Sequence, residues 1–508
     1  MTYSAPDSST PRHPAPLLHF GHPDSHIPFY AAPETPSAAP KKTAILLFLV
    51  CSIVAAFLGQ LFEKIGSAAV TPDVPLRWVL PFVLLLAGIA TMPFLARHFW
   101  EKHYHHVAIL LALVVSFYYV CFLRVNAPAG APFFPSHAGR SIARSFSDYI
   151  SFIFLLGSLF TVSGGILIRV RRKATPAVNA SLLLTGAVLA NAFGTTGAAM
   201  LLIRPYLRIN KGHIRPFHII FFIFIIANVG GCLTPIGDPP LFLGFLKGVP
   251  FWWVLRKCWS AWALVVTALI GVFYALDRSN FLRAPRGVRD LETARETWKF
   301  NGMRNVVFLA IILGAVFLRS PPGLSEALMV LAALGSWFAT PKPVHKANDF
   351  NFAPIREVAW LFFGIFATMA PALDYLELHA GHLGLDSSLK FFWFTGALSA
   401  ALDNAPTYLT FLAAAVGGQG FSLGQPPQVV QFALLHDHEL IAISLGAVFF
   451  GAFTYIGNGP NFMVKSICER AKVRTPGFVE YVLKYALPVL LPILSVVAFL
   501  FFSRWQVL

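Results

Sequence analysis

The stretch Thr234-Pro-Ile-Gly-Asp-Pro-Pro240 is a polar, helix-breaking run inside an otherwise apolar segment. Apolar residues fill 217–229 before it and resume at 241–245 after it. In a lipid bilayer every backbone N–H and C=O group needs a hydrogen-bond partner, so such a break is tolerated only where it is buried in protein or lines a watery cavity. The stretch therefore predicts a broken transmembrane helix.

A second copy of this break, Thr454-Tyr-Ile-Gly-Asn-Gly-Pro460, interrupts another apolar segment near the C-terminus. Two matching breaks in the two halves of a membrane chain indicate the binding site of a transporter. Two further segments also match each other. Thr185-Gly-Ala-Val-Leu-Ala190 precedes the first break, and Thr395-Gly-Ala-Leu-Ser-Ala400 precedes the second. The chain is therefore predicted to contain an internal repeat.

The composition predicts an all-α polytopic membrane protein, because 56% of the 508 residues are hydrophobic and only 12% are charged. The formal net charge is +16, but the basic residues form short clusters between apolar segments, which is how membrane topology is set. We therefore expect the lipid bilayer as a partner and no nucleic acid. Walker A, catalytic-triad and zinc-ligand spacings are absent from the sequence, which argues against an ATP-driven pump or a membrane enzyme. We expect no cofactor beyond a coupling ion.

Two apolar runs predict re-entrant hairpins. Basic clusters flank both ends of 178–203, so both ends should lie on the cytoplasmic side, and the run is too short for two spans of about 20 residues each. Its tip would be Asn191-Ala-Phe-Gly-Thr-Thr196. The second run, 390–416, has the tip Leu402-Asp-Asn-Ala-Pro-Thr407 and almost no basic flank, so it should enter from outside. Hairpins that enter from opposite faces predict an inverted repeat.

These elements give about eleven transmembrane helices and two hairpins, with the N-terminus in the cytoplasm and the C-terminus outside. The expected order is a disordered cytoplasmic tail at 1–42, a first half at 43–276 with a hairpin (178–203) and a broken helix (217–247), a basic cytoplasmic loop at 277–304, and a second half at 305–508 with a hairpin (390–416) and a broken helix (440–464). The other predicted spans are 43–62, 78–96, 104–123, 149–168, 258–276, 305–318, 325–340, 358–373 and 479–502.

Two carboxylates at the breaks, Asp238 and Asp403, are the strongest candidates for an ion site. A charged group at membrane depth is costly and usually functional, and sodium and protons can compete for one carboxylate. We expect both to be sodium ligands. The alternative is that each aspartate caps the N-terminus of a half-helix.

Hydroxyl, amide and glycine positions at the two breaks and the two hairpin tips complete the expected binding set. Broken helices expose carbonyl oxygens that suit a cation and N-terminal amides that suit an anion. The set comprises Asn191, Thr195, Thr196, Asn228, Thr234, Gly237, Asn404, Thr407, Thr454, Gly457 and Asn458. The alternative is that these residues only cap and kink the helices.

The pattern of hairpin, broken helix, hairpin and broken helix resembles the ion transporter superfamily, over roughly residues 43–503. Its marks are Asn191-Ala-Phe-Gly-Thr-Thr-Gly197, Asn228-Val-Gly-Gly-Cys-Leu-Thr-Pro-Ile-Gly-Asp-Pro-Pro240, Asp403-Asn-Ala-Pro-Thr407 and Thr454-Tyr-Ile-Gly-Asn-Gly-Pro-Asn461. The resemblance is strongest to bacterial D-type sodium:proton antiporters and citrate transporters. It implies a homodimer in a bacterial inner membrane, with a scaffold domain and a mobile, elevator-like transport domain.

Three functions remain open at this point. A sodium/proton antiporter working by alternating access is favoured, because two aspartates lie at the breaks and no arginine does. The second is a sodium- or proton-coupled transporter of citrate-type carboxylates or of oxyanions, favoured by the helix N-termini and the Asn/Thr tips. The third is a membrane ion sensor that does not transport.

Overall fold

The computed structural model describes residues 71–123, 137–171, 175–211, 214–283, 297–318, 320–321 and 323–503. The predicted tail at 1–42 and first span at 43–62 lie outside these residues. The described part is almost entirely helical, and eight of its helices are long and apolar enough to cross a membrane. A ninth is counted if α16 (Pro426–Leu435) and the helix that follows it form one bent span. The prediction of an all-α polytopic membrane protein is confirmed.

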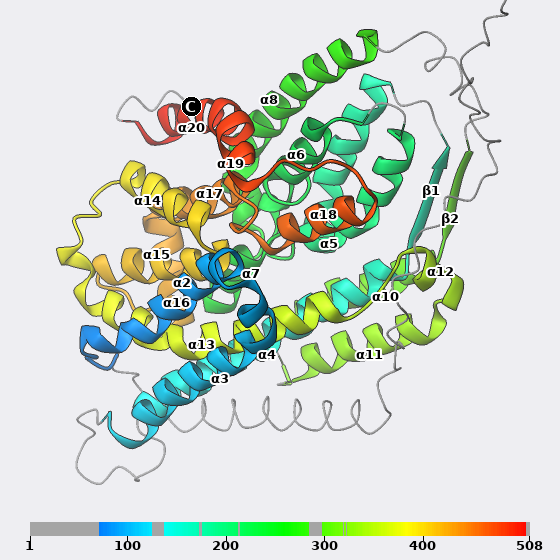
Figure 1. Cartoon of the computed structure of the whole chain (residues 1–508). Helices are drawn as coiled ribbons and strands as arrows, with labels where there is room; N and C mark the ends of the chain where they lie inside the picture. Colours follow the sequence, from blue (N-terminus) through cyan, green and yellow to red (C-terminus); the bar gives the residue numbers. More distant parts are fainter. Residues whose placement is uncertain are drawn as a thin grey trace, which may run out of the picture. The chain divides into compact units, whose positions relative to one another are not determined.

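Figure 1 shows the arrangement of these elements. The first half contains η1 (Leu76–Val79), α2 (Leu80–Leu95), α3 (Arg97–Cys121), α4 (His137–Gly164), β1 (Leu167–Arg171), α5 (Pro176–Ile209), α6 (Pro216–Ile225), η2 (Val229–Leu233), α7 (Pro239–Lys247) and α8 (Trp253–Arg283). The second half contains β2 (Thr297–Asn301), α10 (Asn305–Ala315), α11 (Leu324–Ala339), α12 (Lys342–Ala347), α13 (Ala353–His379), η3 (Ala380–His382), α14 (Ser388–Ala401), α15 (Asn404–Gly418), α16, α17 (Asp437–Phe450), η4 (Gly451–Phe453), α18 (Gly459–Arg470), α19 (Phe478–Tyr481), the π-helical segment η5 (Val482–Leu490) and α20 (Leu491–Phe502).

The structure differs from the sequence prediction around the basic loop at 277–304. Residues 277–283 continue α8, and β2 pairs antiparallel with β1, Leu167 opposite Asn301 and Arg171 opposite Thr297. The helix that corresponds to the predicted span 149–168 ends earlier, at Gly164. Carbonyl groups at this end accept hydrogen bonds from a side chain of the second half. Asn348 donates to the carbonyl oxygens of Gly164 and Ile166, both at 2.8 Å. The short helix α16 was not predicted.

The described helices pack as two groups, which we call the scaffold panel and the core bundle. In the scaffold panel, α13 packs against α2, α3 and α4, and α11 packs against α4 and α10 (Figure 1). The core bundle contains α5 to α8, α14, α15 and α17 to α20, with α14 against α17 and α5 against η2 and α8. Helices α4 and α13 of the panel contact α5, α7 and α15 of the bundle.

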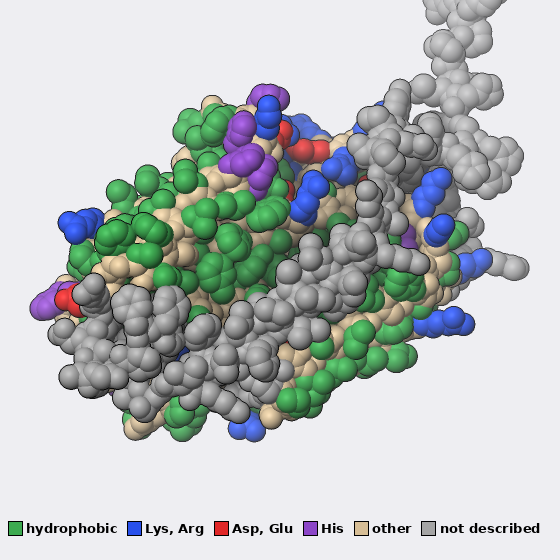
Figure 2. All heavy atoms as spheres, turned by 90° about the horizontal axis from the view of Figure 1, so that it is seen from below, with side chains coloured by type: hydrophobic (Ala, Val, Ile, Leu, Met, Phe, Trp, Pro, Cys, Tyr) green, Lys and Arg blue, Asp and Glu red, His purple; other side chains and the backbone are tan. Residues whose placement is uncertain are grey.

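The outer surface of the panel is apolar, as a lipid-facing surface must be. Large hydrophobic side chains are exposed along α2 and α3, including Leu84 at 54%, Leu110 at 63% and Phe117 at 61%. Figure 2 shows hydrophobic side chains spread over the visible face, with most basic side chains near its margins. Bilayer lipid, rather than water, is the natural solvent for such a face.

Helix α5 is a hairpin, although its helical hydrogen bonding is nearly continuous. A straight helix would separate Asn179 from Asn210 by about 46 Å, yet their side-chain amides hydrogen-bond at 2.8 and 2.9 Å. The chain reverses at Gly194, whose φ of 73° and ψ of 155° are outside the helical region. This is the reversal that the sequence predicts at the tip 191–196.

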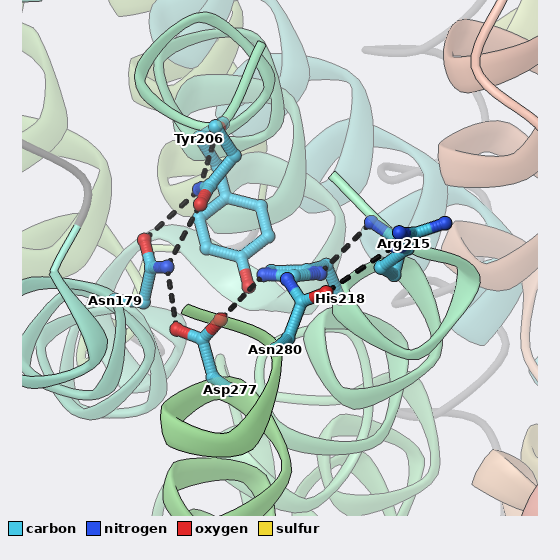
Figure 3. A network of polar contacts seen from close by, with 7 residues as sticks. Asn179, Tyr206, Arg215, His218, Asp277 and Asn280 are labelled. Atoms are coloured by element: carbon cyan, nitrogen blue, oxygen red, sulfur yellow. Dashed lines mark hydrogen bonds and ion pairs between the residues drawn. The ribbon is translucent and has the colours of Figure 1, made fainter. Parts of the chain in front are cut away.

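A buried polar network fixes the base of this hairpin (Figure 3). Asn179 of the first arm donates to Asp277 of α8 at 2.8 Å, and His218 of α6 meets the other carboxylate oxygen at 3.0 Å. The Nδ1 atom of His218 accepts from the backbone N–H of Arg215, so Nε2 carries the proton that is donated to Asp277. The network therefore joins both arms of the hairpin to α6 and α8.

Replacement of Gly194 tests the reversal. An L-residue with this φ and ψ is strained by about 1–3 kcal/mol, and its Cβ would lie 3.3 Å from the carbonyl oxygen of Ile236. We expect Gly194→Ala to lower the thermal unfolding midpoint of the detergent-purified protein, followed by tryptophan fluorescence. Gly271→Ala is the matched control, because a Cβ added at this position in α8 has nothing within 4 Å. An equal midpoint for the two variants would contradict the predicted strain.

Candidate functional site

Asp238 lies where two hairpins and two broken helices meet. The hairpins are α5 and the pair α14–α15, and the broken helices are α6–η2–α7 and α17–η4–α18. Its carboxylate accepts from Thr195 Oγ1 at 2.8 Å, from Asn404 Nδ2 at 2.7 Å and from Asn458 Nδ2 at 3.0 Å. These donors come from the first hairpin tip, the second hairpin tip and the second break. Asp238 is 1% exposed, so protein groups replace water around this carboxylate.

The capping alternative for Asp238 does not hold. Asp238 occupies the N-cap position of α7, but its side chain makes no capping hydrogen bond to that helix. The carboxylate is directed instead to residues that lie 43, 166 and 220 positions away in the sequence. A residue kept only to start a helix would bond to the first-turn amides.

The two halves build their sites with the same backbone contacts. In the first half, Thr195 N–H donates to Gly237 O at 2.8 Å. In the second half, Asn404 N–H donates to Gly457 O at 3.1 Å. Each hairpin tip is thus joined to the glycine of the break in its own half.

The threonines of the two breaks also have equivalent roles. Thr234 Oγ1 donates to Asn191 O at 2.6 Å, and Thr454 Oγ1 donates to Ala400 O at 2.8 Å. Each hydroxyl also accepts from the glycine N–H three residues later, at 3.0 and 3.1 Å. These threonines therefore position the breaks and do not contact the carboxylate.

The two breaks are joined directly by Asn228 and Asn461. Asn228 Nδ2 donates to Asn461 Oδ1 at 2.7 Å. Asn461 donates in turn to the carbonyls of Gly451 and Thr454, at 2.8 and 2.9 Å. Asn461 belongs to the second motif but was not among the expected site residues. The sequence does distinguish Asn461, because it is a polar amide at the position where the first motif has the apolar Leu241.

Four helix N-termini surround Asp238. Helix α7 starts after Asp238, α15 after Asp403 and α18 after Asn458, and the second arm of α5 starts after the reversal at Gly194. Each N-terminus carries roughly half a positive charge. Peptide dipoles thus stabilise the buried carboxylate where the site has no basic side chain.

Asp403 has a different role from Asp238. Its Oδ1 accepts from the N–H of Ala405 at 3.0 Å, which is a helix cap on α15. The side chain is half-buried, and this capping bond directs it to its own helix rather than to the donors around Asp238. Thr407 Oγ1 donates to the carbonyl of Asp403 at 2.9 Å, so both residues shape the second tip.

Two buried amide oxygens in the described structure have no hydrogen-bond partner. They are Oδ1 of Asn228 and Oδ1 of Asn404, and both residues are 0% exposed. Both side chains lie against Gly451, where an added Cβ would be 3.1 Å from Asn228 Oδ1 and 3.2 Å from Asn404 Nδ2. Buried acceptors without donors are costly, and a bound cation would satisfy them.

A cavity borders Asp238 on the side of the scaffold panel. Asp238 is the one charged residue among those that line it, and Thr195 and Thr196 are the hydroxyl residues. The remaining lining residues are apolar or glycine: Phe152, Leu155, Leu156, Leu159, Phe160, Phe193, Gly194, Gly197, Pro235, Ile236, Gly237, Pro239 and Phe242. The lining contains no Lys or Arg side chain.

Comparison with known proteins gives one family. A family model described as "Putative citrate transport" matches residues 71–502, which is most of the chain. No curated protein matches the sequence.

The Asn228–Asn461 link can be tested by a double-mutant cycle. Asn461→Ala removes the partner of Asn228 and of two buried carbonyls, so it should cost about 1–3 kcal/mol for each group left unsatisfied. Asn228→Ala should cost less in the Asn461→Ala background than in the wild type, because the shared bond is already lost. Unfolding midpoints of the four proteins measure the coupling. Gln431→Ala, an exposed amide on α16, is the control; strictly additive costs would contradict the link.

Proposed function

Because the chain belongs to the putative citrate transport family, we propose that it is a secondary active transporter for a small carboxylate such as citrate, coupled to a cation bound at Asp238. The observation that carries this proposal is the single buried carboxylate at the junction of both hairpins and both breaks. Such a group in a membrane is usually an ion ligand or a proton carrier.

The cation is supported by two unsatisfied amide oxygens, one on Asn404, which hydrogen-bonds to Asp238, and one on Asn228. Carboxylate, amide and backbone oxygens are the ligands that sodium prefers, and Asn228 Oδ1 and Asn404 Oδ1 are unused acceptors. A proton on Asp238 would neutralise its carboxylate in the same way as a bound sodium ion. Either coupling ion removes the net negative charge that would otherwise repel a carboxylate substrate.

The anion is supported by the helix N-termini and by the family. The N-terminal ends of α7, α15, α18 and the second arm of α5 supply positive potential without a basic side chain. Thr196 lines the cavity and has a hydroxyl available to a substrate that enters there. We propose these groups as the substrate contacts.

A second candidate function is sodium/proton antiport without a carboxylate. One observation favours it: Asp238 is the one charged group in the cavity lining, and no Lys or Arg there would pair with a multivalent anion. In that case sodium and protons would alternate on Asp238. A non-transporting sensor has no feature in its favour beyond the same ion site.

The protein is a multi-pass membrane protein. We further propose a bacterial inner membrane, a cytoplasmic N-terminus and a homodimer with an elevator-like core bundle. These proposals rest on the basic clusters of the sequence and on the resemblance to the ion transporter superfamily.

Flux into proteoliposomes tests the proposed function. We expect uptake of labelled citrate to rise when an inward sodium or proton gradient is imposed, and to fall by at least about tenfold in Asp238→Asn, because the loss of a buried ionic ligand exceeds roughly 1.4 kcal/mol. Asp386→Asn, an exposed carboxylate paired with Lys390, should transport like the wild type.

The same vesicles distinguish the alternatives. Sodium-driven proton movement, read by an internal pH dye without any citrate uptake, would support antiport. Flux of neither kind in folded, monodisperse protein would contradict both functions.

A further inference from the structure

A second cavity lies between the scaffold panel and the core bundle, and it is strongly polar. Four of its lining residues are charged: Arg144, Lys247, Asp374 and Glu377. Arg144 belongs to α4 and the two acids to α13, whereas Lys247 is the last residue of α7. This cavity is separate from the one that borders Asp238, since the two have no lining residue in common.

An ion pair crosses the boundary at this cavity. Lys247 Nζ of the core bundle lies 2.7 Å from Asp148 Oδ2 of α4, and the two side chains are 16% and 19% exposed. Partial burial reduces solvent screening of the pair. The ammonium also lies at the C-terminal end of α7, where a positive charge is favoured.

Two further polar contacts cross the boundary at the same place. Arg144 Nη1 donates to the carbonyl of Gly424 at 3.1 Å, and the N–H of Leu423 donates to Glu377 Oε2 at 3.2 Å. Gly424 and Leu423 belong to the loop between α15 and α16. The panel is thus fastened to both the first broken helix and the second hairpin.

The other end of the same boundary is held more loosely. The carboxylate of Asp349 lies 3.9 Å from the guanidinium of Arg204 and 3.7 Å from that of Arg470. Asp349 directly follows Asn348, which donates to the carbonyl of Gly164 at the C-terminal end of α4. Its side chain is 68% exposed, so these pairs are screened by solvent. In the part of the chain that the structure describes, the shorter and more buried ionic contact is therefore at the Lys247 end.

Helix α7 connects this ion pair to the candidate ion site. Asp238 precedes its first turn and Lys247 is its last residue, a distance of about 13 Å along the axis. The two ends move together because a nine-residue helix is rigid on this scale. When Asp238 moves relative to the panel, Lys247 moves with it, while Asp148 stays on α4. Such a movement must therefore break the Lys247–Asp148 ion pair.

We propose that Lys247 and Asp148, with Arg144 on Gly424, form a gate that closes the core bundle onto the scaffold panel. Gly424 follows the second hairpin, which the sequence predicts to enter from outside, so we assign the gate to the outer side. This inference rests on the proposed transport function, because a gate has a purpose only if the core bundle moves relative to the panel. Opening separates Lys247 from Asp148, admits water to the cavity and exposes the Asp238 site to that side. The pair is thus a determinant of which side the site faces.

Cysteine labelling tests the gate independently of the substrate. Ser145 lines the cavity and is 6% exposed, so Ser145→Cys should react slowly with a membrane-impermeant maleimide added to intact cells. The background would carry serine at Cys121, which is exposed, and at Cys51, which lies outside the described residues; Cys232, Cys258 and Cys468 are buried. Lys247→Glu places two negative charges together, and we expect labelling to become roughly five- to tenfold faster. The combined change Lys247→Glu with Asp148→Lys should restore the slow rate.

A matched ion pair within the core bundle provides the control. Lys257 and Asp437 also lie 2.7 Å apart, but they join α8 to α17 and do not cross the boundary. Lys257→Glu should therefore change the labelling rate less than about twofold. Lys247→Gln, without a repulsive charge, serves as the second variant if Lys247→Glu does not fold, and should give a smaller acceleration.

The outcomes separate the gate from the proposed function. Equal labelling in Lys247→Glu and the wild type, or equal acceleration by Lys257→Glu, would overturn the gate even if citrate or sodium flux is intact. Faster labelling that the double reversal suppresses would support the gate even if the transported species is neither of these. Labelling from the inside alone would contradict its assigned side.

Discussion

A single buried carboxylate constrains the centre of this protein. Asp238 is buried, so its charge needs hydrogen-bond donors from protein groups. The chain supplies them from three distant segments, and each segment can reach Asp238 only if its helix is interrupted. The two hairpin reversals and the two breaks thus act together to solvate one charge inside an apolar bundle.

The same requirement explains the close packing of backbone around the site. An added Cβ at Gly231 would lie 2.6 Å from Gly237 O, and one at Gly457 would lie 2.7 Å from Gly451 O. The halves of each break approach one another without side chains between them. Their peptide groups can then hydrogen-bond to the hairpin tips, and Thr234 and Thr454 accept from the N–H groups of Gly237 and Gly457.

Sequence patterns predicted the fold class and much of this centre. The polar motif in an apolar segment located Asp238, and the paired basic clusters predicted the reversal that Gly194 makes. The sequence could not show whether Asp403 has the same role as Asp238, because a capping aspartate and an ion-binding aspartate precede the same kind of helix. Asn461 was missed since its partner, Asn228, is 233 residues away. The β1–β2 ribbon was missed for a similar reason: its strands come from different halves and neither has a period of its own.

The two halves are alike in backbone but differ in charge at the residue that follows the glycine of each break. Asp238 and Asn458 occupy the same position of the two motifs, each directly after the glycine that receives the hairpin tip. If the halves descend from a duplicated ancestor, one substitution was enough to make this position charged in one half and neutral in the other. A symmetric cradle with two carboxylates would need two cations to be neutral, and one with two amides would need none. The formal charge at this position of the cradle thus depends on one atom: a carboxylate oxygen of Asp238 in one half, where Asn458 of the other half has an amide nitrogen.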